Sequence, residues 1–220
     1  MTDGSRTYDT RGRQAAAERN RAAVVDACRH LVLRDGYRAT TVKAVAQRAG
    51  VSPELVYKVF GGKKQVMKAV YDVTLAGDHE PTGMADRPEL RDALAAADLG
   101  EALTRYAAFV LGVHQRLSVL TTVLAESDPD LADLAATADA ERLTGVTAFV
   151  DHLADKGLLA PDVDLAESAD ACWLLTSSTV FVQATRSREW TDDRYRTWLT
   201  RMLHGNLPAA RPRRRRSPAT

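Results

Sequence analysis

Residues 40–64 read TTVKAVAQRAGVSPELVYKVFGGKK and contain two short helix patterns separated by a compact turn. The first pattern ends at Gly50, a residue type that readily closes a helix. The second begins at Ser52, which can cap a helix, and has Pro53 at the first helical position, where its missing N–H does no harm. Two short helices joined by so tight a turn indicate a helix-turn-helix. The apolar stripe of the first helix comprises Val42, Val45, Ala46 and Ala49.

Helices are also predicted on both sides of this segment. The preceding stripe ends before Gly36, and the following one starts after Gly61 with Lys63 and Lys64 in its first turn. Cations in a first turn oppose the helix dipole, which suits residues placed to meet an external anion. The two stripes comprise Val24, Val25, Cys28, Leu31 and Val32, and then Val66, Met67, Val70, Val73 and Thr74.

The rest of the chain also has helical periodicity, without a strand pattern or an internal repeat. We expect a long helix after Asp98, which ends or bends near residues 116–118. Further helices are predicted at 130–156, at 164–188 and after a cap at Thr191, with a short one near 89–96. The predicted fold class is therefore all-α, with about nine helices.

The overall charge of +1 hides a strong asymmetry along the chain. Residues 1–64 have a net charge of +7 (13 basic, 6 acidic), and residues 65–210 have −11 (12 basic, 23 acidic). The last ten residues contribute +5 from five arginines. A polyanionic partner would therefore meet the N-terminal block, although arginine-rich ends can also serve solubility alone.

Several classes of protein are disfavoured. No apolar run reaches the roughly 18 residues of a membrane span, and residues 1–10 do not resemble a signal peptide, so we expect a cytoplasmic protein. The chain lacks G-x-S-x-G, P-loop, G-x-G-x-x-G and H-E-x-x-H sequences, so we expect no enzyme, cofactor or metal site. Cys28 and Cys172 lie in separate apolar helix patterns and are interpreted as buried free thiols.

The run Thr40–Ser52, followed by Val56-Tyr57, Phe60 and Lys63-Lys64, closely resembles the signature of the tetracycline-repressor (TetR) family. The resemblance covers roughly residues 18–73, about a quarter of the chain. It implies an all-helical homodimer with an N-terminal DNA-binding domain of three helices. It also implies a divergent C-terminal domain that binds a ligand, which usually releases the operator.

These expectations divide the chain into five segments. We expect a basic disordered arm at 1–14, the helix-turn-helix DNA-binding domain at 15–62 and a connecting helix at 63–76. A ligand-binding and dimerisation domain is expected at 77–207, with an Arg-rich disordered tail at 208–220.

The second helix of the helix-turn-helix can enter the major groove with its N-terminus first. Lys43 and Lys58 can donate to guanine, and Glu54 can accept from cytosine. Pro53 would read shape or a methyl group. These four residues are the base-edge candidates; for Glu54, a plain first-turn helix acid is the alternative.

The resemblance to the TetR family also implies four phosphate contacts, which would fix the register on DNA. Simple helix capping is the alternative for Thr41 and Ser52, and core packing is the alternative for Tyr57. The phosphate candidates are Thr41, Ser52, Tyr57 and Lys63.

A dimer is expected because one short recognition helix reads too few bases, and two half-sites solve this. The last two predicted helices would form the interface, with Trp173, Ser177, Phe181 and Trp198 as candidates, unless these residues only fill the monomer core.

A sensing pocket is expected between the middle helices. Its candidate lining residues, each of which can instead belong to core or surface, are Tyr106, Phe109, His114, Phe149 and His152.

The sequence therefore favours a dimeric one-component transcription regulator, a repressor that binds a palindromic operator and is released by an unidentified small molecule. A helix-turn-helix regulator without a physiological ligand is the main alternative. A helical interaction module that never touches DNA is a third.

Overall fold

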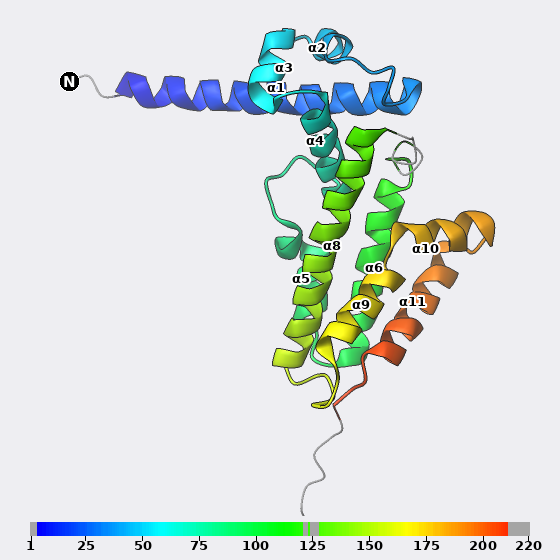
Figure 1. Cartoon of the computed structure of the whole chain (residues 1–220). Helices are drawn as coiled ribbons and strands as arrows, with labels where there is room; N and C mark the ends of the chain where they lie inside the picture. The colour runs from blue at the N-terminus through cyan, green and yellow to red at the C-terminus, as the bar shows by residue number, and fades with distance from the viewer. Residues whose placement is uncertain (1–3, 121–122, 124–127, 211–220) are drawn as a thin grey trace, which may run out of the picture. The chain divides into compact units, whose positions relative to one another are not determined.

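The computed structural model describes residues 4–120, 123 and 128–210, with side chains from Gly12 onward. The described residues are almost entirely helical and contain, besides helices, one isolated antiparallel bridge between Leu159 and Ala209. The predicted all-α class is confirmed (Figure 1). The helices are α1 (Gly4–Asp35), α2 (Val42–Ala49), α3 (Pro53–Phe60), α4 (Lys63–Ala76), α5 (Pro88–Ala95), α6 (Leu99–Leu117), α8 (Pro129–Asp155), α9 (Leu165–Leu175), α10 (Ser178–Val182) and α11 (Asp192–Asn206), with a 3-10 turn η1 (Met84–Asp86) and a π-helical turn η2 (Gln183–Ser187).

The chain forms two compact units. Unit 1 comprises the described residues of Met1–Glu80 and Arg116–Ala136, and unit 2 those of Pro81–Gln115 and Thr137–Thr220. The segment 116–136 therefore packs with the N-terminal unit, although the sequence placed it in the C-terminal domain. Its leucines explain the difference, because Leu117, Leu120, Leu131 and Leu134 are all buried.

In unit 1, α2 packs against α1 and α3, and α4 packs against α1 (Figure 1). The predicted stops and caps are present. Gly50 and Gly61 close α2 and α3 with φ of 70° and 90°, in the left-handed region that glycine adopts without steric cost. The buried apolar side chains of this unit include Val24, Val25, Cys28, Leu31, Val32, Val45, Ala46, Val56, Val66, Met67 and Val70.

Unit 2 has one continuous apolar core formed by α5, α6, α8, α9, α10 and α11. The predicted caps at its helix starts are confirmed: Asp98 Oδ1 accepts from the Glu101 amide at 2.9 Å, and Thr191 Oγ1 accepts from the Arg194 amide at 3.2 Å. The core includes Ala102, Leu103, Tyr106, Val110, Phe149, Val150, Leu153, Cys172, Phe181, Tyr195, Leu199, Leu203 and Leu207.

The structure differs from the expected disordered arm at 1–14. Helix α1 begins at Gly4 and runs without a break to Asp35. The residues from Gln14 to Arg19 are strong helix formers, so the helix continues beyond its apolar stripe even though most of its side chains there are exposed.

The helix predicted at 164–188 is broken. Helix α9 ends at Leu175, and α10 starts at Ser178. The Thr176 hydroxyl donates to the Cys172 carbonyl at 2.8 Å, at the end of α9. Ser177 Oγ accepts from the Val180 amide at 3.3 Å and so caps the start of α10. Hydroxyl groups compete with the helical hydrogen bonds, and the cluster Thr176–Thr179 therefore starts a new helix.

The chain end also differs from the prediction. Residues 208–210 are ordered, since the Ala160 amide donates to the Pro208 carbonyl and the Ala210 amide to the Leu158 carbonyl, both at 2.9 Å. The arginine run 213–216 lies outside the described residues. No helix in the described part of the chain is long and apolar enough to cross a membrane.

Both thiols are predicted to be inert in the folded protein. Cys28 and Cys172 are free and fully buried, and burial raises the pKa of each thiol to about 12. Because the thiolate is the reactive form, a disulfide reagent at about pH 8 should modify neither cysteine in the native state and both in denaturant. Fast modification of either thiol in the folded protein would contradict this burial.

Candidate functional site

The helix-turn-helix presents the predicted base-edge residues to solvent. Lys43 on α2, and Glu54 and Lys58 on α3, are exposed, and Pro53 is half-buried. Val56, in the middle of α3, is fully buried and fixes which face of this short helix points outward. Three of the four candidates therefore lie on accessible surface, two of them with positive charge.

The predicted phosphate residues fall into two groups. Thr41 and Ser52 cap α2 and α3: Thr41 Oγ1 accepts from the Ala44 amide at 3.1 Å, and Ser52 Oγ accepts from the Leu55 amide at 3.2 Å. Both residues are exposed, so their capping role leaves them accessible. Tyr57 is 55% exposed, which excludes core packing as its role.

Lys63 is directed into unit 1 instead of outward. Its Nζ donates to the Tyr37 carbonyl at 2.8 Å and lies 3.9 Å from the centre of the Tyr37 ring. The sequence could not reveal this contact, because the two residues are 26 positions apart. In this arrangement the ammonium is engaged by an internal carbonyl and a ring face, which together replace part of its hydration.

Glu54 has contacts within its own helix turn. Hydrogen bonds from its own amide and from the Ser52 hydroxyl hold the pKa of the carboxyl below its usual value. The carboxylate is exposed and ionised, as expected of a first-turn helix acid. It remains accessible as a hydrogen-bond acceptor.

The sequence reasoning missed an acidic set at the start of α8, which lies in unit 1 and pairs with Tyr37 and Lys64. Tyr37 Oη donates to Asp130 Oδ2 at 2.9 Å, and Lys64 Nζ lies 2.5 Å from Asp133 Oδ2. Burial and the Asp130 hydrogen bond raise the pKa of Tyr37, and Asp133 raises the pKa of Lys64. The aspartates at 128–133 gave no signal because their partners are more than 60 residues away.

The structure buries three of the five pocket candidates, Tyr106, His114 and Phe149, in unit 2, and Phe109 is partly buried against the same core. Tyr106 and Phe149 stack with ring centroids 3.8 Å apart, and Phe109 lies 6.0 Å from Tyr106. His114 is buried and stacks on Phe181 at 4.8 Å. His152 is elsewhere, since its Nε2 lies 2.9 Å from the Leu94 carbonyl at the end of α5.

The dimer candidates all have partners within unit 2. Phe181 is buried against His114 and Tyr195, so the alternative of core filling holds for this residue. Ser177 caps α10, and Trp198 lies 5.9 Å from Tyr195. By contrast, Leu174 on α9 is 59% exposed, an outward apolar side chain that the sequence pattern did not distinguish from core.

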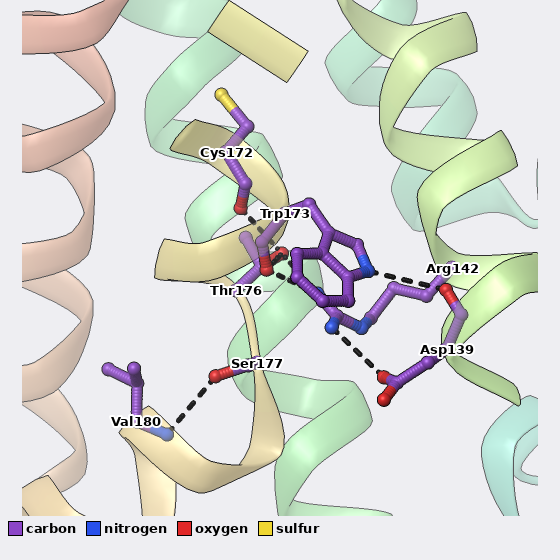
Figure 2. A network of polar contacts seen from close by, with 7 residues as sticks. All are labelled: Asp139, Arg142, Cys172, Trp173, Thr176, Ser177 and Val180. Atoms are coloured by element: carbon purple, nitrogen blue, oxygen red, sulfur yellow. Dashed lines mark hydrogen bonds and ion pairs between the residues drawn. The ribbon is translucent and has the colours of Figure 1, made fainter. Parts of the chain in front are cut away.

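Trp173 belongs to a polar cluster around Arg142 of α8 (Figure 2). The guanidinium donates to the Trp173 carbonyl and to Asp139 Oδ1, the latter at 3.0 Å, and lies 4.5 Å from the indole centre. The indole Nε1 donates back to the Asp139 carbonyl at 3.2 Å. Arg142 thereby satisfies a backbone carbonyl at the end of α9 that the helix break leaves without a helical partner.

Among the described residues, no group of three or more His, Cys, Asp or Glu side chains could hold a metal ion. The chemistry of the two units is therefore that of surface cations and hydrogen-bond donors in unit 1 and an aromatic interior with a few polar groups in unit 2.

Comparisons with known proteins agree with this description. Residues 24–70 match the family model described as "Bacterial regulatory proteins, tetR family". The chain thus has the DNA-binding domain of TetR-family transcription regulators. No curated protein sequence matches the chain.

Three solved structures extend the likeness beyond that domain. A chain from Rhodococcus sp. classed as a TetR-family transcriptional regulator is 18% identical, with a TM-score of 0.65 over 86% of this chain and 98% of that one. The flavonoid-responsive regulator FrrA is 22% identical (TM-score 0.62; 89% and 99% covered). NalD of Pseudomonas aeruginosa, a secondary repressor of the MexAB-OprM efflux pump, is 17% identical (TM-score 0.63; 87% and 97% covered). Over 86–89% of its length, the chain therefore has the fold of these regulators.

His114 makes the stability of the protein sensitive to acid. Burial, and to a lesser extent the charge of Arg142, lowers its pKa from 6.5 to about 4. At a pH between these two pKa values, His114 binds a proton in the unfolded state but not in the folded state. This contribution to the free energy of unfolding is complete above pH 6.5 and falls by about 3 kcal/mol as the pH drops to about 4.

Urea unfolding at about pH 7 and pH 4.5 measures the loss. The variant His114→Phe keeps an aromatic ring against Phe181 but cannot be protonated, so it should lose less stability than the native protein. An equal loss in both proteins would mean that the imidazole is not shielded from protonation.

Proposed function

We propose that the protein is a dimeric one-component transcription regulator, a repressor that binds a palindromic operator through α2 and α3 and leaves it when a small molecule binds in unit 2. The observation that carries the proposal is the family match over residues 24–70, combined with the outward placement of Lys43, Tyr57 and Lys58. The net charge of +7 over residues 1–64 supports a polyanionic partner.

In the proposed complex, α3 enters the major groove with its N-terminus first. Lys43, Pro53, Glu54 and Lys58 lie at base edges, where lysine donates to guanine and glutamate accepts from cytosine. Thr41, Ser52 and Tyr57 contact phosphates; as caps, Thr41 and Ser52 also hold the first turns of α2 and α3 in place. Lys63 would join them only by leaving the Tyr37 carbonyl.

The proposed dimer reads two half-sites of the operator. Trp173 and Trp198 are half-buried in the isolated chain, and the exposed Leu174 lies next to Trp173 on α9, so these side chains offer apolar area to a second copy. Ser177 is small enough for close approach between helices. Phe181 supports the interface only indirectly, through the core that it fills.

Ligand control requires that binding in unit 2 change the affinity of unit 1 for DNA, with a coupling of typically about 1 to 3 kcal/mol. Helix α8 is suited to this task because it contributes contacts to both units. Asp130 and Asp133 pair with Tyr37 and Lys64 in unit 1, and Arg142 holds the end of α9 in unit 2. The similar fold of FrrA, a flavonoid-responsive regulator, supports sensing of an organic molecule by this fold.

Selection of genomic fragments by the purified protein at about 150 mM salt tests the proposal, because non-specific attraction to DNA is weak there. We expect enrichment of a two-fold symmetric site. The double variant Lys43→Glu/Lys58→Glu should bind this site at least about 100-fold more weakly, since two favourable contacts become repulsive.

The matched control is Arg91→Glu/Arg188→Glu, which changes the net charge equally at exposed positions of unit 2. It should retain operator binding within about threefold. A folded, dimeric protein that enriches no site would contradict the proposal and favour a helical interaction module. An operator that no small molecule releases would favour a regulator without a physiological ligand.

A further inference from the structure

The interior of unit 2 contains two polar side chains whose hydrogen-bonding groups have no partner within the described residues. They are His114 of α6 and Tyr195 of α11, which are 5% and 0% exposed. In the part of the chain that the structure describes, neither ring nitrogen of His114 nor the Tyr195 hydroxyl makes a hydrogen bond. The Thr176 backbone opposes the effect of burial on the pKa of His114, but its geometry relative to the ring is not that of a hydrogen bond.

The unpartnered groups are close to each other. The His114 and Tyr195 rings have centroids 6.1 Å apart and meet edge to face. Most buried polar groups in native proteins have a partner in the protein or in an ordered water, so two adjacent exceptions require an explanation. One explanation, which fits a ligand-sensing protein, is that a bound guest molecule supplies the missing hydrogen bonds.

The surroundings of the pair are aromatic. Phe181 stacks on His114 at an interplanar angle of 13° and meets Tyr195 edge-on at 5.0 Å. The ring centroids of Trp198 and Tyr195 are 5.9 Å apart, and those of Trp190 and Trp198 are 5.7 Å apart. Aromatic surroundings of this kind favour a flat apolar molecule as the guest.

The chemistry of the pair selects the polar group of the guest. A neutral imidazole offers one donor and one acceptor, and a phenol hydroxyl can do both. A hydroxyl group on the guest can pair with one His114 ring nitrogen and the Tyr195 hydroxyl at once, since it donates one hydrogen bond and accepts another. A carboxylate only accepts, and Arg142, the cation acting on both rings, is already held by Asp139 and the Trp173 carbonyl.

We propose that His114 and Tyr195 form the polar recognition point of the effector site, and that the effector is a flat, mainly apolar aromatic molecule bearing a hydroxyl group. This inference rests on the proposed function, because it assigns the chemistry of the ligand that releases DNA. Tyr195 is the residue that the sequence did not reveal, since its spacing on α11 is that of an ordinary core residue.

Equilibrium dialysis with matched probes tests the proposal. The probes are phenol and benzene, 2-naphthol and naphthalene, and 4-hydroxybiphenyl and biphenyl. For at least one pair, the native protein should bind the hydroxylated member about tenfold or more tightly, because the hydroxyl satisfies groups that the hydrocarbon leaves unpaired. His114→Phe and Tyr195→Phe should each reduce this preference, and the double variant should bind both members of that pair equally.

A second measurement, thermal unfolding without a probe at neutral pH, separates this site from a structural water site. If the groups are unpartnered, Tyr195→Phe should raise the Tm by about 2–4 °C, since an uncompensated buried hydroxyl is removed. The control Tyr71→Phe, a hydroxyl deletion in unit 1, should keep the preference for the hydroxylated probe.

Equal binding of all three pairs by the native protein would overturn the proposal, as would a preference that survives both variants. Tighter binding of 2-naphthoate than of 2-naphthol would assign an acid instead of a hydroxylated effector. A lowered Tm in both variants would assign the pair to a buried water. Operator binding without any probe is measured separately, so loss of the proposed function and loss of this ligand site give different results.

Discussion

The helix-turn-helix depends on one constraint, the satisfaction of backbone groups at helix ends. The first four amides and last four carbonyls of any helix lack helical partners, and α2 and α3 have only eight residues each. Their ends therefore make up most of the helix. Hydroxyl caps at Thr41 and Ser52 and left-handed glycines at positions 50 and 61 supply the missing partners and stops. Without these caps and stops, two such short segments would be only marginally stable as helices.

The same constraint shapes unit 2 with different groups. The hydroxyl cluster after Leu175 interrupts an otherwise apolar helix. The break leaves carbonyl groups at the end of α9 without helical hydrogen-bond partners. The Arg142 guanidinium, on the separate helix α8, donates a hydrogen bond to one of them, the Trp173 carbonyl (Figure 2). Its pairing with Asp139 balances its charge. A side chain of α8 thereby supports a helix end that α9 alone would leave unsatisfied.

Buried polar groups with and without partners occur in different places. In unit 1 the Tyr37 hydroxyl has Asp130 and the Lys63 ammonium has the Tyr37 carbonyl, so burial and hydrogen bonding go together. In unit 2, His114 and Tyr195 are buried without such partners in the described residues. This contrast agrees with the functions proposed for the two units, DNA binding by unit 1 and ligand binding by unit 2.

Local signals in the sequence determined the helical class, the helix-turn-helix and the outward residues of α3, because caps, glycine stops and apolar spacing act over a few positions. They also predicted α8 and α11 nearly to the residue. The break at Thr176 had a local signal in its hydroxyl cluster, but the apolar run around it outweighed that signal. Only the tertiary structure decided that Asp130 meets Tyr37, 93 residues away, that Lys63 points inward, and that His114 lies beside Tyr195. Such contacts depend on how whole helices pack, and no spacing along the chain records which residues packing brings together.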